Sequence, residues 1–151
     1  MIQYLIKVKT VVLFLATLII ILTNTFIFRA LKVDFGNNSV EDTPKIIIFI
    51  LVVFIAPFFE TLVFNLLPVK LMQYLTRSTF LIIFSSSFAF ALIHIYSIAY
   101  LLMTYIGGIF LNTLYLVFEK KHGILKAFLL IISLHSIYNL IGFILMELRI
   151  I

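Results

Sequence analysis

The sequence contains no cysteine among its 151 residues, which excludes disulfide bonds, thiolate metal sites and a cysteine nucleophile. Charged residues make up only 11% of the chain, whereas hydrophobic residues make up 64%. This balance excludes an ordinary soluble globular domain. The net charge of +5 does not indicate nucleic-acid binding, because the basic residues lie between apolar runs instead of clustering. We therefore expect an integral membrane protein whose constant partner is the lipid bilayer.

Five apolar runs divide the chain, and each is long enough to cross a bilayer as a helix. They predict an all-α fold, a polytopic transmembrane helix bundle of about five spanning helices, in a single domain over residues 1–151. The first run lacks the small-residue cleavage pattern of a signal peptide, so we expect it to remain as a span. The polar segment 29–45 is expected to be an exposed loop. The five runs cover residues 11–28, 46–67, 80–96, 98–118 and 124–146.

The basic residues also predict an orientation in the membrane. Seven of the 11 Lys and Arg residues lie at the amino terminus or in the connections after the second and fourth runs. The other four lie in the first connection and at the carboxyl terminus. Because cytoplasmic segments carry an excess of Lys and Arg, we expect the amino terminus in the cytoplasm and the carboxyl terminus outside.

Glu60 is an acid inside the second run, which is otherwise almost wholly apolar. An ionisable side chain near the middle of a bilayer costs roughly 2.5 to 3.5 kcal/mol on insertion scales, so it marks a functional site by default. The structural alternative is that Glu60 is merely tolerated, either as the neutral acid or by extending toward the interface.

Three more isolated polar residues lie in apolar surroundings: His94 in the third run, and His135 and Asn139 in the fifth. His135 and Asn139 are four residues apart and therefore share one helix face. At ~1.5 Å per residue, all four side chains lie roughly 15 to 22 Å from the cytoplasmic face. We expect them to meet in one layer near the middle of the membrane.

This set of residues is suited to the activation of water. A carboxylate can act as a general base, an imidazole can orient the water, and imidazole and amide donors can stabilise an oxyanion. Each residue alone could instead be an ordinary packing residue. Glu60, His94 and His135 could also hold a divalent metal such as zinc, although the HExxH spacing is absent. We expect no cofactor, with zinc as the alternative.

Three motifs, taken in order, resemble the CPBP family of intramembrane proteases, which includes the prenyl-protein CAAX endopeptidases and bacterial bacteriocin-processing and self-immunity proteins. The first family motif, EExxxR after Ala-Pro, corresponds to residues 56–65. The second, FxxxH, corresponds to Phe90 and His94, and the third, HxxxN, to His135 and Asn139. The resemblance covers roughly residues 56–139, inside a core at about 46–146 that follows one extra span.

The resemblance implies a CAAX-type intramembrane endopeptidase that hydrolyses a peptide or protein substrate entering from the membrane. Glu60 would activate the water, His94 would help to hold it, and His135 with Asn139 would stabilise the oxyanion. It also implies a location in a bacterial plasma membrane. The oligomeric state and the identity of the substrate do not follow from the sequence.

Two positions depart from the first motif: the second Glu is Thr61 and the Arg is Asn65. Because these positions are four apart on a helix, losing both leaves no unpaired buried charge, and a Thr61–Asn65 hydrogen bond could replace the ion pair. The departure also raises the alternative of a catalytically silent member that confers bacteriocin immunity by binding. A third possibility is a small proton- or ion-coupled transport subunit with Glu60 in a relay.

Overall fold

The computed structural model describes residues 2–31 and 43–148, and every regular element in these ranges is helical. The prediction of an all-α helix bundle is confirmed. Most of the expected loop at 29–45 and the last residues of the chain lie outside the described residues. The elements are α1 (Ile2–Leu5), α2 (Thr10–Ala30), α3 (Lys45–Ile50), η1 (Leu51–Ile55), α4 (Ala56–Glu60), η2 (Thr61–Leu66), α5 (Leu67–Leu75), α6 (Thr79–Ala91), α7 (Ile98–His122) and α8 (Ile124–Glu147).

Four helices of the described chain are long and apolar enough to cross a membrane, where the sequence predicted about five. The segments α3 to α5 form one of them, a continuous helix of 31 residues. The others are α2, α7 and α8. The third predicted span, residues 80–96, instead contains the 13-residue helix α6. At ~1.5 Å per residue, α6 is roughly 20 Å long, which is short of a ~30 Å hydrocarbon core.

The side chain of His94 accounts for the early end of α6. In a continuing α-helix, the backbone N–H of His94 would donate to the carbonyl of Phe90. The imidazole Nδ1 donates to that carbonyl instead, at 3.0 Å, and the backbone N–H of His94 turns to Ala91 O at 2.8 Å. The chain then runs without regular structure over residues 92–97, until the Ser97 hydroxyl caps the start of α7. Irregular backbone at membrane depth is stable only within protein or beside a water-filled cavity.

Two prolines explain the wide π-helical turns η1 and η2 in the long helix. Each turn ends two residues before a proline, and the residue between them closes the wide turn: Ala56 N–H donates to Leu51 O, and Leu67 N–H donates to Leu62 O. Proline has no N–H and its ring clashes with the preceding turn, which disturbs the α-helical pairing. The span expected to end near residue 67 therefore widens just before Pro68 and continues as an α-helix to Leu75.

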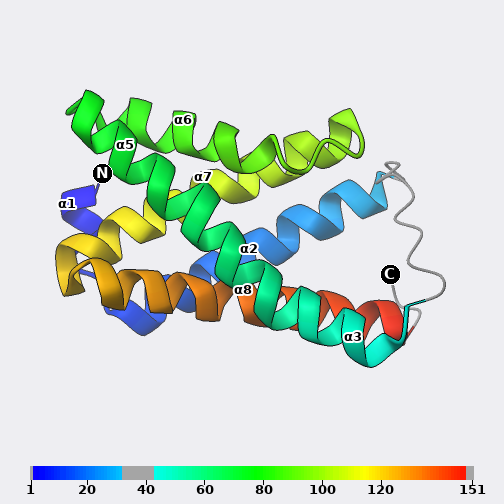
Figure 1. The fold of residues 1–151 in the computed structure, drawn as a ribbon. Coiled ribbons are helices and arrows are strands. Elements are labelled where there is room, and N and C mark those ends of the chain that lie inside the picture. Colours follow the sequence, from blue (N-terminus) through cyan, green and yellow to red (C-terminus); the bar gives the residue numbers. More distant parts are fainter. Residues whose placement is uncertain (1, 32–42, 149–151) are drawn as a thin grey trace.

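The helices run back and forth between the two ends of the bundle, and α1 and the end of α8 lie at opposite ends (Figure 1). Helix α7 is central: it packs against α2, α6 and α8, and more than half of its apolar stretch is buried. Gly108 allows α6 to approach α7 closely, because a Cβ there would lie 3.3 Å from both Ser87 and Phe90. Gly108 is therefore the site of close helix packing, whereas Gly107 has open space beside it.

Candidate active site

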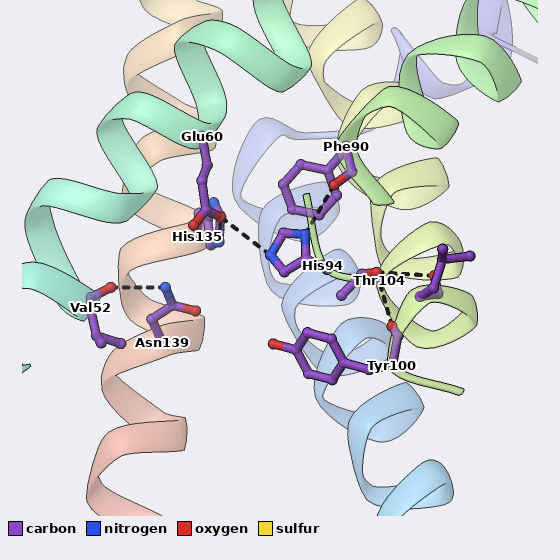
Figure 2. A network of polar contacts seen from close by, with 9 residues as sticks. Val52, Glu60, Phe90, His94, Tyr100, Thr104, His135 and Asn139 are labelled. Carbon is purple, nitrogen blue, oxygen red and sulfur yellow. Dashed lines mark hydrogen bonds and ion pairs between the residues drawn. The ribbon is translucent and has the colours of Figure 1, made fainter. Parts of the chain in front are cut away.

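Glu60, His94, His135 and Asn139 line one cavity of about 280 Å³, which we call the polar cavity. Glu60 comes from α4, His94 from the turn after α6, and the other two from α8. Figure 2 shows Glu60 and both histidines turned toward one another, with Asn139 one helical turn farther along α8. The convergence expected from their depth is therefore present, while their catalytic roles remain predictions.

Both imidazoles face the same carboxylate oxygen. His135 Nε2 lies 3.5 Å and His94 Nε2 lies 3.8 Å from Glu60 Oε2. The side chain of His135 is 6% exposed, that of His94 13% and that of Glu60 23%. Exposure thus increases from the imidazole of His135 to the carboxylate, so Glu60 is the member of the group that water reaches most easily.

The hydrogen bond of His94 fixes which nitrogen carries its proton. Because the carbonyl of Phe90 can only accept, Nδ1 must donate to it. In the neutral imidazole, Nε2 then has a lone pair that faces Glu60 Oε2. Two acceptors that face each other require a proton or a water molecule between them. The FxxxH spacing therefore has a structural reason. The carbonyl of the Phe, four residues before the His at the end of a helix, accepts from the imidazole and fixes its orientation.

His135 presents the same ring nitrogen, Nε2, to Glu60, but with the proton on it. Its Nδ1 is buried and has no hydrogen-bond partner among the described residues. A bare ring nitrogen in that position is less costly than a buried N–H without an acceptor. The proton of the neutral ring therefore belongs on Nε2, which faces Glu60. The carboxylate is flanked by a donor from α8 and by an acceptor from the turn after α6.

Asn139 has a structural contact that the sequence did not predict. Its amide Nδ2 donates to the carbonyl of Val52 at 2.9 Å. That carbonyl lacks its helical partners, because Ala56 N–H donates to Leu51 O and Pro57 has no N–H. Asn139 therefore satisfies a carbonyl that Pro57 releases and ties α8 to η1.

The polar cavity also has residues that were not singled out from the sequence, among them Asn24, Tyr100 and Tyr138. Asn24 Nδ2 donates to Met103 O at 2.9 Å, and the Thr25 hydroxyl lies 2.6 Å from the Tyr138 hydroxyl. These contacts hold α2 against α7 and α8. The sequence did contain a signal for these contacts, namely the polar pair Asn24 and Thr25 within an apolar run. Polar side chains on membrane helices usually form hydrogen bonds to a neighbouring helix.

The expected Thr61–Asn65 hydrogen bond is not formed, which corrects the sequence prediction. Asn65 Nδ2 donates to Asn112 Oδ1 at 3.0 Å, and Asn112 Nδ2 donates to Ser87 Oγ at 3.1 Å. The hydroxyl of Thr61 has no partner among the described residues. All four side chains are completely buried. Two amides and one hydroxyl thus link η2, α7 and α6 through hydrogen bonds, and we call Asn65, Asn112 and Ser87 the amide chain. It begins at the position at which the first motif has its Arg.

We predict that Asn112→Leu lowers the free energy of unfolding by about 1–2 kcal/mol, because it removes two interhelical hydrogen bonds and leaves Asn65 without a partner. Unfolding in mixed micelles with rising SDS measures the change. Thr113→Val is the matched control, since the Thr113 hydroxyl bonds only to Ile109 O in its own helix. Equal stability of the two variants would show that the amide chain contributes nothing to the bundle.

No group of three or more His, Cys, Asp or Glu side chains in residues 2–31 and 43–148 is arranged to hold a metal ion. The zinc alternative for Glu60, His94 and His135 therefore gains no support from the geometry and stays a prediction. The contacts that do exist, with two nitrogens facing one carboxylate oxygen, suit proton transfer.

Comparison with known families identifies one family model, described as type II CAAX prenyl endopeptidase Rce1-like, which matches residues 42–141. No curated protein and no solved structure matches the chain. The matched range covers about two thirds of the sequence and includes Glu60, His94, His135 and Asn139. It does not include α2, which nevertheless contributes Asn24 to the wall of the polar cavity.

Proposed function

The chain belongs to the Rce1-like type II CAAX prenyl endopeptidase family, and on this premise we propose that it is an active intramembrane endopeptidase. Family membership supports a CAAX-type protease in general. The residues and the order of events proposed below go further. They rest on one observation above all: the two imidazole nitrogens, from different segments of the chain, that both face Glu60 Oε2.

Glu60 acts as the general base in this proposal. A water molecule between Glu60 Oε2 and His94 Nε2 would donate one hydrogen to each, because both atoms are acceptors. Its lone pairs then point into the cavity, toward a peptide carbonyl. As the water attacks, its proton passes to Glu60, which can return it to the departing amine. General-base catalysis of this kind contributes typically 10²–10⁴-fold.

His135 and Asn139 supply the donors for the oxyanion. The Nε2–H of His135 lies on the wall of the cavity, and the amide of Asn139 has a second N–H besides the one bonded to Val52. Such donors act where negative charge develops in the transition state. The irregular backbone at residues 92–97 lies beside the same cavity and is consistent with access for water.

Membrane proteomics of cells that express the wild type or Glu60→Gln at equal level tests this function. We expect membrane-attached precursors to accumulate in the Glu60→Gln cells and shortened carboxyl termini to appear with the wild type. Identical termini in the two strains would contradict the proposal.

A silent, binding member of the family is the second candidate, and the substitutions at Thr61 and Asn65 favour it. That candidate predicts bacteriocin immunity in both the wild type and Glu60→Gln, with no cleaved product in either. The buried amide chain of Asn65, Asn112 and Ser87 argues for the active enzyme, because it replaces the lost ion pair with contacts of its own. The family match speaks against the transport subunit.

We propose that the chemistry needs no metal. Incubation with 1,10-phenanthroline should leave the cleavage rate within about twofold, because the base, the water and the oxyanion donors all come from side chains. A loss of activity that added zinc restores would support the zinc alternative.

The protein is integral to the membrane, and we propose a bacterial plasma membrane with the amino terminus in the cytoplasm. The end of α7 and the start of α8 lie at the same end of the bundle as the start of α2 (Figure 1). These helix ends contain Lys120, Lys121 and Lys126, which favours the cytoplasmic side for this end. A protease-sensitive tag at the amino terminus should be protected in intact cells, and one at the carboxyl terminus should be cleaved. Cleavage of the amino-terminal tag alone would show that the protein has the opposite orientation.

A further inference from the structure

A second and larger hollow, of about 870 Å³, lies on the side of the bundle. We call it the lateral groove. Its floor is α7 over residues 109–120, and its walls are α2 over 13–20 and α6 over 79–84, with α1 beside it. The lining shared by these helices is mostly apolar. The groove and the polar cavity have no lining residue in common.

The polarity of the groove changes along its length. Lys120, Gln3 and Thr79 lie at the end where α7 finishes and α6 begins. Ile20, Phe84 and Ile109 line the part toward the middle of the bundle. A ligand that fits this pattern has a polar head at the membrane surface and an apolar tail.

The length of the groove matches one leaflet. From Lys120 to Ile109 the floor spans 11 residues, which at ~1.5 Å per residue is roughly 17 Å. Half of a ~30 Å hydrocarbon core is about 15 Å. An acyl chain that enters from the surface would therefore reach the inner end of the groove near the middle of the bilayer.

The charges at the polar end select the head group. Lys120 lines the groove there. Three further exposed basic residues lie in the connections at this end of the bundle: Lys7 and Lys9 between α1 and α2, and Arg77 before α6. Among the described residues, the acid at this end is Glu119, and its charge is paired with that of Lys70. A lysine near an anionic lipid surface contributes about 1 kcal/mol of attraction. An anionic phosphate head is thus favoured over a zwitterionic one.

From these observations we propose that the lateral groove is a binding site for one anionic phospholipid, with its phosphate near Lys120 and an acyl chain along α7 between α2 and α6. The site is separate from the proposed active site and does not depend on the proposed function. The bound lipid would be a fixed structural element that fills the groove between α2 and α6.

Native mass spectrometry of the purified full-length protein tests the site. The probes are phosphatidylglycerol and phosphatidylcholine with the same acyl chains, added in equal amounts. We expect phosphatidylglycerol to bind preferentially. Lys120→Gln should weaken its binding about fivefold, which corresponds to ~1 kcal/mol. Lys126→Gln, which removes a charge at the same end but outside the groove, should leave binding nearly unchanged.

A second variant tests the acyl chain. Ala16→Phe projects a ring into the groove and should abolish binding of phosphatidylglycerol, whereas Ser133→Phe, on the exposed surface of α8, should not. Thermal unfolding of each variant checks that the bundle is intact. Equal binding of the two lipids, insensitive to both groove variants, would overturn the proposal. Preferential retention of a neutral isoprenoid would also overturn it. The same holds if a second copy of the chain occupies the groove and excludes lipid.

Discussion

Glu60→Gln should lower kcat by roughly 100-fold or more. Glutamine keeps the size of the side chain but cannot take the proton of an attacking water, so the general-base contribution is lost. The folded state should change little, because the contacts of Glu60 with the two imidazoles are longer than ordinary hydrogen bonds. Cleavage rates in proteoliposomes, together with SDS unfolding, measure the two effects separately.

Glu147→Gln is the matched control for Glu60→Gln. Glu147 pairs with Lys45 at the far end of the bundle, away from the polar cavity. We expect its substitution to leave kcat within about twofold, since exposed ion pairs contribute little. Full activity in Glu60→Gln would remove the general base from the mechanism.

Asn139→Ala should lower kcat about 100- to 1000-fold, the loss typical of one oxyanion donor. It should also lower the free energy of unfolding by about 1–3 kcal/mol, because the carbonyl of Val52 would lose its donor. These two effects have different causes and are measured separately, by kcat and by unfolding. Ser133→Ala, whose hydroxyl bonds within α8, should change neither.

The comparison of the two measurements identifies the role of Asn139. A loss of stability with kcat within tenfold would mean that Asn139 only caps the carbonyl released by Pro57. A large fall in kcat places its second N–H at the reacting carbonyl. The first result would leave His135 as the side-chain donor for the oxyanion.

The meeting of Glu60, His94, His135 and Asn139 could be predicted because helix geometry converts sequence position into depth. Each residue is about 11 to 15 positions from the same end of its segment, so a fixed rise per residue brings them to similar levels. The cost of isolated polar groups in lipid supplied the reason for them to share a cavity. Both arguments need only the local sequence and the bilayer.

The details that failed depend on partners from distant parts of the chain. Asn65 was expected to bond to Thr61 on its own helix, but Asn112 of α7 lies across from it and takes its amide. Helix α6 was expected to continue, but the imidazole of His94 replaced the backbone N–H at the carbonyl of Phe90. A spacing pattern does not show which of two competing donors a carbonyl accepts.

The contact between Asn139 and Val52 was missed for a related reason. Pro57 indicates a disturbed helix in the sequence, but not which carbonyl is left without a donor. That assignment depends on the wide turn of η1, where Ala56 N–H reaches Leu51 O and passes over Val52. The position of α8 then decides that Asn139 supplies the missing donor.

The central claim, that Glu60 activates water and does not itself attack the substrate, is tested most directly by single-turnover cleavage in ¹⁸O-labelled water. The new carboxyl terminus of the product and the peptide that contains Glu60 are then weighed by mass spectrometry. We predict one ¹⁸O atom in the product carboxylate and none in Glu60. Label in the Glu60 carboxylate would show a covalent anhydride intermediate, and the absence of labelled product would show that the protein does not hydrolyse peptides; either result would contradict the mechanism.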